Sequence, residues 1–248
     1  MTNRAQIFCA VAGPVGALLF GVGLLGAHFI PPTPPLTSID DVLTLYRENA
    51  TGIRLCGIAM FFLLTALMTQ YTGLSDQIRQ INSPQARTWA RVQVTLGGIS
   101  LVPVYGSGIC WELATYRLER APEITQTLND MGWFYLVTPV APALIQMFAA
   151  GFGTLADKSA TPLFPRWYSY FSFWVGVVLM TGLLVPFFKV GPWAWNGLLS
   201  FWVAASTLGL WLNVTGMLMI KVAKRQPAAA MAPPADAGYS SAAYSKSA

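Results

Sequence analysis

The stretch IRLCGIAMFFLLTALMTQYT, from Ile53 to Thr72, decides the fold class of this chain. It is apolar over about 20 residues, the length that an α-helix needs to cross about 30 Å of bilayer hydrocarbon. Five further stretches have the same character, and helices in soluble proteins are rarely so uniformly apolar. The six stretches are Ile7–Ile30, Ile53–Thr72, Trp89–Trp111, Met131–Leu155, Trp167–Phe188 and Trp193–Ile220. The sequence therefore predicts an all-α polytopic membrane protein, a bundle of six transmembrane helices.

Composition supports one domain and a tail. Of 248 residues, 54% are hydrophobic and 10% are charged, whereas an ordinary soluble domain has about 25% charged residues. Residues 1–225 are almost entirely spans and short loops, so we expect a single six-helix transmembrane domain there. Residues 226–248 are rich in Ala, Pro and Ser, and such a segment buries too little apolar surface to order itself. We expect it to be a disordered cytoplasmic tail.

The distribution of Lys and Arg predicts the topology. If the N-terminus is cytoplasmic, ten Lys and Arg residues fall on the inner side and five on the outer side, as the positive-inside rule favours. The inner ten are Arg4, Arg79, Arg87, Arg91, Lys158, Arg166, Lys221, Lys224, Arg225 and Lys246. We therefore expect a multi-pass protein of the cell membrane with both termini in the cytoplasm. Because topology explains the net charge of +5, we do not expect nucleic acid as a partner. The expected partner is the lipid bilayer.

The first span carries two further signals. It ends in His28-Phe29-Ile30 before two prolines, a poor cleavage site, so we interpret it as a retained span rather than a signal peptide. Gly13, Ala17 and Gly21 are spaced by four, which lets another helix approach closely. Packing within the bundle is favoured over a homodimer contact. After the span, Ser38 and Asp41 predict the capped start of a short outer helix.

Several prolines lie inside the spans. Membrane helices tolerate internal prolines where neighbours satisfy the freed carbonyl groups, and broken helices also mark binding sites in many transporters. A simple kink is the favoured interpretation. No internal repeat is recognisable, which argues against an inverted-repeat transporter. The internal prolines are Pro14, Pro103, Pro139, Pro142 and Pro186.

Residues suited to catalysis or metal binding are few. His28 is the only histidine, which excludes a bis-histidine haem, a histidine-rich di-iron centre and the usual zinc proteases. Ser107 lies between glycines but outside a nucleophile-elbow motif, and a serine protease is disfavoured. Cys56 and Cys110 are expected near the same face, which leaves a disulfide open. We predict no catalytic residue, no metal ligand and no cofactor.

The outer rim holds the candidate functional residues. Arg54, Glu112, Asp130 and Lys189 are each predicted to stand at the outer end of a span. Charges at membrane depth are costly and usually paired, so Arg54 with Glu112 and Lys189 with Asp130 are candidate ion pairs. With Asn196, these residues are alternatively the mouth of a ligand site.

Aromatic residues concentrate in the last two spans. Those at the span ends are typical of interfacial belts. Phe173, Trp174, Phe201 and Trp202 are expected deeper, where they either pack the core or line an apolar pocket. Packing is the favoured interpretation, and Trp174 and Trp202 remain ligand-binding candidates.

Several short stretches resemble a family of uncharacterised bacterial multi-pass integral membrane proteins. They are Phe29-Ile30-Pro31-Pro32, Tyr46-Arg47-Glu48-Asn49, Gly52-Ile53-Arg54, Leu128-Asn129-Asp130-Met131-Gly132-Trp133, Phe164-Pro165-Arg166-Trp167, and Pro186-Phe187-Phe188-Lys189 through Trp195-Asn196-Gly197. They spread over most of the chain, so the resemblance concerns the whole protein. It implies no particular activity.

The sequence leaves three classes of function open. The favoured class is a non-catalytic membrane protein: a subunit, a scaffold, or a binder of an apolar small molecule or lipid. Its partners are then the lipid bilayer with a membrane partner protein or an apolar ligand. The first alternative is a transporter or channel for a small solute, which the proline-broken spans favour and the lack of an intramembrane carboxylate disfavours. The second alternative, a membrane-embedded enzyme, has the fewest suitable side chains.

Overall fold

The computed structural model of the chain describes residues 3–225 and is all helical over that part. The helices are α1 (Asn3–Gly26), α2 (Ile39–Glu48), α3 (Ala50–Arg79), α4 (Pro84–Tyr116), α5 (Pro122–Val137), α6 (Ala141–Leu155), α7 (Arg166–Leu179), the 3₁₀-helix η1 (Met180–Phe187), the π-helix η2 (Leu198–Val203) and α8 (Ala204–Arg225). The predicted tail lies outside the described residues.

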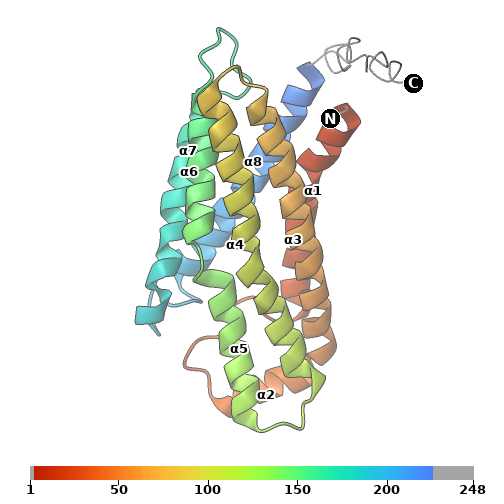
Figure 1. Cartoon of the computed structure of the whole chain (residues 1–248). Coiled ribbons are helices and arrows are strands. Elements are labelled where there is room, and N and C mark those ends of the chain that lie inside the picture. The colour runs from red at the N-terminus through yellow and green to blue at the C-terminus, as the bar shows by residue number, and fades with distance from the viewer. Residues whose placement is uncertain (1–2, 226–248) are drawn as a thin grey trace, which may run out of the picture.

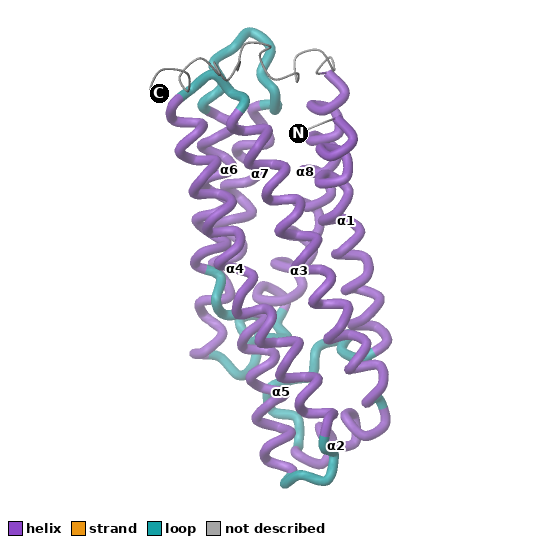
Figure 2. Tube along the Cα trace, turned by 45° about the vertical axis from the view of Figure 1, so that its right-hand side comes forward, coloured by secondary structure: helices purple, strands orange, loops and turns teal. Residues whose placement is uncertain are grey.

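Six helical segments of the described chain are long and apolar enough to cross a membrane. They are α1, α3, α4, α5 with α6, α7 with η1, and η2 with α8. The prediction of an all-α bundle with six spans is therefore confirmed. Both ends of the described chain lie at one end of the bundle, and α2 lies across the other (Figures 1 and 2). We call the two halves the terminal half and the α2 half.

Small residues allow α1 to pack closely on α3. A Cβ atom placed on Gly16 would lie 2.7 Å from the Cβ of Ala66, and one on Gly23 would lie 3.2 Å from the Cα of Cys56. Gly13 faces the side-chain amide of Gln70 in the same way. The expected packing within the bundle is thus present, but Gly21 does not share in it, since no atom lies within 4 Å of its Cβ position.

Gln70 joins three helices in the terminal half. Pro14 has no N–H, so the carbonyl of Ala10 lacks its usual partner within α1. The fully buried amide Nε2 of Gln70 donates to that carbonyl at 3.4 Å and to the carbonyl of Leu212, on α8, at 2.9 Å. A polar side chain from α3 therefore compensates for the proline in α1 and ties both α1 and α8 to α3.

A second set of polar contacts joins α7 to α8 in the same half. The hydroxyl of Tyr168 lies 2.9 Å from that of Thr215, and the indole N–H of Trp211 donates to the hydroxyl of Ser172 at 3.0 Å. The rings of Tyr168 and Trp211 stack at 6.4 Å. Because every polar atom in these contacts is paired away from lipid, they fix the helix register at little desolvation cost.

The single histidine ends α1. His28 has a positive φ of 56°, the left-handed conformation common just after a helix end. The N–H of Phe29 donates to the carbonyl of Leu24 at 2.9 Å, and that of His28 to Leu25 at 3.1 Å. These two bonds form a Schellman motif. The exposed His28 is therefore a helix cap in this structure.

The short helix α2 begins as predicted. The hydroxyl of Ser38 accepts the backbone N–H of Asp41 at 3.2 Å and donates to its carboxylate at 2.7 Å. At the other end of α2, the Tyr46 hydroxyl donates to Oδ1 of Asn129 on α5 at 3.2 Å. Burial, together with the nearby Asp130 charge, raises the pKa of Tyr46 well above its usual value, so this hydroxyl keeps its proton.

Candidate functional site

Three of the six spans lose α-helical geometry at one level of the α2 half. The fourth span breaks at Thr138–Val140, next to Pro139, so that α5 and α6 are separate helices. The fifth tightens into η1 after Leu179, and the sixth begins as η2 before α8. Non-helical backbone at membrane depth occurs where it is buried in protein or lines a cavity.

These irregular segments contact one another. The hydroxyl of Thr181, on η1, donates to the carbonyl of Leu199 on η2 at 3.2 Å, and that of Ser200 donates to Thr181 at 3.3 Å. Gly182 lies so close to the carbonyl of Val137, at the end of α5, that a Cβ atom there would clash with it. The carbonyl groups freed by the breaks therefore have partners or close neighbours within the protein.

A cavity of about 370 Å³ lies where the breaks meet. It falls in the range of small-molecule sites, roughly 300–1,000 Å³. Ser200 is the one polar residue of its lining, and its single hydroxyl proton has two carbonyl acceptors within reach, Trp193 at 3.1 Å and Thr181 at 3.3 Å. The lining residues are Ala17, Phe20, Gly21, Leu24, Leu63, Leu67, Val104, Leu136, Val137, Val140, Leu179, Gly182, Ser200, Phe201, Ala204, Ala205, Leu208, Gly209 and Leu212.

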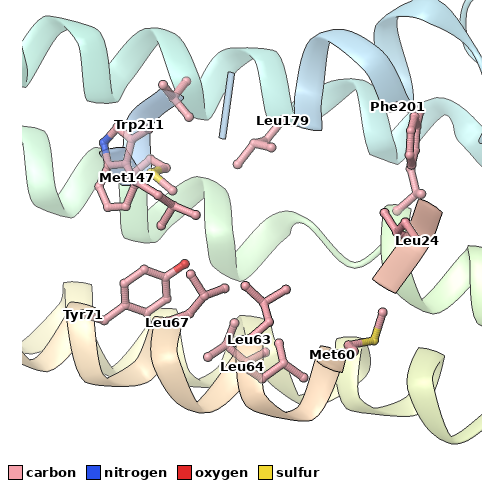
Figure 3. Close-up of a cluster of buried hydrophobic side chains, with 14 of the residues drawn as sticks. Leu24, Met60, Leu63, Leu64, Leu67, Tyr71, Met147, Leu179, Phe201 and Trp211 are labelled. Carbon is pink, nitrogen blue, oxygen red and sulfur yellow. The ribbon is translucent and has the colours of Figure 1, made fainter. Parts of the chain in front are cut away.

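Figure 3 shows part of the cavity wall. Leu63 and Leu67 of α3 face Leu179 of α7, while Leu24 and Phe201 stand toward one end and Tyr71 and Trp211 toward the other. The ring of Phe201 contacts Trp133 at 6.0 Å, and Trp133 packs on Trp111 at 5.1 Å. A block of buried aromatic rings therefore stands behind Phe201 in the α2 half.

The cavity is bounded on one side by α1 and α8. In the terminal half these helices touch, because a Cβ atom on Gly216 would lie 2.5 Å from the carbonyl oxygen of Ala10. Farther along, Gly21 of α1 and Gly209 of α8 have no atom within 4 Å of their Cβ positions. Figure 1 shows α8 crossing the bundle obliquely, while α1 follows α3. With the exposed Ala205, these residues mark an opening of the cavity toward the membrane.

The predicted outer-rim site is not assembled as a whole. Arg54 and Glu112 lie on neighbouring helices but do not form the expected ion pair. The guanidinium of Arg54 donates to the carbonyl of Thr115 at 2.6 Å and to its hydroxyl at 3.3 Å, since carbonyls in the last turn of a helix lack partners within it. Glu112 instead lies against Gly57, whose Cβ position is 2.6 Å from its Cγ.

The second predicted pair is also absent. Asp130 accepts the side-chain N–H of Asn129 at 3.1 Å, while Lys189 is exposed in the connection between η1 and η2. Asn196 lies partly exposed in the same connection. Within residues 3–225, the one ion pair closer than 4.0 Å joins Arg79 to Asp76 at 3.8 Å. The four charged residues of the predicted outer-rim site therefore contact backbone, amide groups or solvent.

The two tryptophans predicted as pocket residues face outward. Trp174 is 51% exposed and stacks on Phe171, and Trp202 is 38% exposed. Neither lines the cavity, whereas the adjacent Phe201 does. Neighbouring residues of a helix point in different directions, and only the position of the π-helical turn decides which of the two rings faces inward. Trp174 and Trp202 therefore do not line this cavity, and their role as ligand-binding residues stays a prediction.

The remaining reactive side chains have structural surroundings. The hydroxyl of Ser107 donates to the carbonyl of Gly132 at 2.7 Å, which fastens α4 to α5. Cys56 and Cys110 are buried free thiols, so the disulfide left open by the sequence is not formed. Over residues 3–225 there is no group of three or more His, Cys, Asp or Glu side chains with the spacing of a metal site.

Of the lining residues, only Phe201 was named from the sequence as a possible pocket residue, because the search for a site followed charges and aromatic rings. The cavity is lined mainly by Ala, Gly, Leu and Val, which are common in every span. Two signals were available in Pro139 and in the glycines of the first and last spans, but neither shows which segments meet. Comparison with protein-family models, curated proteins and solved structures gives no match. The resemblance to uncharacterised bacterial membrane proteins stays a prediction.

Proposed function

We propose that this protein is a non-catalytic membrane binder of one apolar molecule, a lipid chain or an apolar small molecule, in the cavity between α1, α3 and α8. The observation that carries the proposal is the lining, in which eighteen of the nineteen residues are apolar and Ser200 is the exception. Such a wall offers dispersion contacts but no free hydrogen-bonding group. It therefore favours a hydrocarbon surface over a polar solute.

The opening between α1 and α8 supports access from the bilayer. Ala17 and Gly21 lie on one side of it and Ala205 and Gly209 on the other, so small side chains line both edges. An apolar ligand dissolved in the membrane then reaches the cavity without crossing water. Binding of such a molecule also fits a role of this protein as a subunit or scaffold. In that role, the ligand or a membrane partner protein would cover the opening between α1 and α8.

Native mass spectrometry of the full chain, purified in mild detergent, tests the proposal. Gly21→Leu and Gly209→Leu add bulk at two lining positions where no atom lies within 4 Å of the new Cβ. Gly26→Leu is the matched control, since its Cβ position is equally open but lies outside the lining. We expect the wild type and the control to retain one apolar molecule and the two cavity variants to lose it. Equal retention by all four proteins would contradict the proposal.

A transporter is the second candidate, favoured by the meeting of three irregular spans at one level. Broken spans around a central site are typical of transporters. The two candidates differ in one measurement. In sealed vesicles a binder holds its apolar ligand without moving a small solute, whereas a transporter gives solute flux that Gly209→Leu reduces.

We further propose that the protein lies in the cell membrane with both chain ends in the cytoplasm. The excess of Lys and Arg on the loops at the terminal end of the bundle supports this orientation. A reporter fused after Ile81 is then cytoplasmic, and one fused after Thr125 is external. A cytoplasmic signal from the second fusion would reverse or break the proposed topology.

A further inference from the structure

A second hollow lies on the membrane-facing side of the bundle, between α3 and α4. This groove has a volume of about 360 Å³. It lies on the other side of α3 from the cavity, since Leu64 and Met68 line the groove whereas Leu63 and Leu67 line the cavity. The groove residues are Leu64, Thr65, Met68, Thr69, Thr72, Gly98, Leu101, Val102 and Tyr105.

The groove presents an apolar surface despite its threonines. The hydroxyl of Thr65 donates to the carbonyl of Phe61 at 3.0 Å, and those of Thr69 and Thr72 donate one turn back at 2.9 Å each. Because each hydroxyl is satisfied within α3, the threonines offer no free donor to the groove. The groove therefore suits a hydrocarbon chain.

Two charged residues continue the same helix faces toward the α2 end. On α4, Tyr105 and Glu112 are seven residues apart, which places them on one face about 10 Å apart. On α3, Arg54, Gly57, Phe61 and Thr65 recur at intervals of three and four. The rings of Phe61 and Tyr105 stack at 5.7 Å between the groove and the charges. Groove, aromatic pair and charges thus form one continuous strip, the α3–α4 strip.

The two charges of this strip do not neutralise each other. Glu112 is partly exposed beside Gly57 and has no cationic side chain within 4.0 Å in the described part of the chain. Arg54 is exposed, and its guanidinium uses two of its five donors on Thr115. An unpaired anion and a cation with free donors, on neighbouring helices at the same end of the bundle, are complementary to a group that carries both charges.

We propose that the α3–α4 strip binds one phospholipid with a primary ammonium headgroup. The phosphate accepts hydrogen bonds from Arg54, the ammonium donates to Glu112, and one acyl chain lies in the groove. The distance along α4 from Glu112 to Gly98 is about 21 Å. One leaflet has the same depth, with about 15 Å of hydrocarbon and an interfacial layer of several ångströms. The strip therefore fits a single lipid of the leaflet next to α2.

The headgroup follows from the chemistry of Glu112. A primary ammonium has three N–H donors for a carboxylate, whereas a trimethylammonium has none, and charge-assisted hydrogen bonds are the strong ones. Arg54 does not distinguish a primary ammonium headgroup from a trimethylammonium headgroup, because both carry the same phosphate. The site should therefore prefer phosphatidylethanolamine over phosphatidylcholine with identical acyl chains.

Native mass spectrometry of the full chain, titrated with each of these two lipids, tests this proposal. We expect the wild type to retain phosphatidylethanolamine about tenfold better, as one charge-assisted hydrogen bond allows. Glu112→Gln should remove the preference for phosphatidylethanolamine. Arg54→Gln should weaken the binding of both lipids. Gly98→Leu, whose new side chain meets only the flexible end of Met68, should weaken both without changing the preference. Circular dichroism checks that each variant is folded.

Glu123→Gln and Arg117→Gln are the matched controls, because both residues are exposed near the same end of the bundle but lie off the strip. They should bind both lipids as the wild type does. Equal retention of the two lipids by the wild type would overturn the proposal, as would a loss of preference in Glu123→Gln as large as in Glu112→Gln. These variants leave the interior cavity unchanged, so the outcome is independent of the proposed function.

Discussion

The terminal half and the α2 half of the bundle use the same kind of sequence in opposite ways. In the terminal half, Gln70 bridges α1, α3 and α8, and Tyr168 and Trp211 join α7 to α8 through paired polar atoms. In the α2 half, three spans lose α-helical geometry and surround a cavity of about 370 Å³. The contacts of the terminal half stabilise the bundle. The α2 half can therefore contain a cavity while the fold is retained.

The two halves should differ most in the stability that is lost when a buried aromatic ring is truncated. Trp211 is fully buried in the terminal half and donates to Ser172. Trp211→Ala should reduce the free energy of unfolding by about 3–5 kcal/mol, since it removes a large packed side chain. Phe201→Ala should cost clearly less, because that ring already borders a cavity. Chemical denaturation in detergent measures both, and equal losses would contradict the contrast between the halves.

Two glycines of α8 give a finer test. Gly216→Ala places a methyl group against the carbonyl of Ala10 and should destabilise the bundle by about 1–3 kcal/mol through overpacking. Gly209→Ala meets no atom within 4 Å and should be neutral, or stabilising by up to about 1 kcal/mol through helix propensity. Thermal unfolding of the pair decides whether α1 and α8 separate between these positions. A similar loss in both variants would show that they do not.

The turn between α6 and α7, at the terminal end, should give a pH-dependent contribution. Burial raises the pKa of Asp157, but hydrogen bonds from the Ser159 hydroxyl, the Leu163 N–H and the Ser159 N–H outweigh it, helped by Arg166. The net pKa lies below the usual value. The stabilisation is therefore fully present above the unfolded-state pKa of about 3.9 and is lost as the pH falls through the folded-state value.

Asp157→Ala removes these contacts and should cost about 1–3 kcal/mol at pH 7. The difference in unfolding free energy between the variant and the wild type should shrink as the pH falls below about 4, because the wild-type carboxyl then becomes protonated and loses its charge. Unfolding curves at pH 7 and at the lowest pH that the detergent tolerates provide the comparison. A difference that does not depend on pH would show that Asp157 acts through packing rather than through its charge.

The end of α1 should give the smallest effect, and one of opposite sign. His28 holds a positive φ of 56°, which glycine adopts without strain. His28→Gly should therefore stabilise the protein by about 0.5–1 kcal/mol. Gly191, with a φ of 81° and open space around its Cβ position, is the reciprocal control. Gly191→Ala should destabilise by a similar amount, and a loss of stability in His28→Gly would mean that the imidazole makes a stabilising contact.

The long apolar stretches predicted the spans because span length depends only on bilayer thickness. The predicted cap at Ser38 followed from local chemistry in the same way. The sequence did not predict that the span beginning near Met131 starts at Pro122, and that α5 and α6 separate at Pro139. Prolines mark both positions, but a proline can start, kink or end a helix, and packing against other helices decides which of these occurs.

The site was harder to predict than the fold, as α3 illustrates. Leu63 and Leu64 are adjacent and chemically identical, yet one lines the interior cavity and the other the membrane-facing groove. Arg54 and Glu112 lie on neighbouring helices, but their pairing depended on which acceptor lay nearest to Arg54, and the carbonyl of Thr115 occupies that place. Contacts of this kind depend on helix rotation and tilt.

Diffraction from crystals of the full chain pressurised with xenon shows whether the α2 half holds an apolar cavity. Apolar cavities bind xenon, which gives an anomalous peak at its position. We expect a peak, or the density of a bound apolar molecule in its place, among Leu67, Val140 and Leu179. Side chains that fill this volume, with xenon found only on the membrane-facing surface, would contradict this expectation.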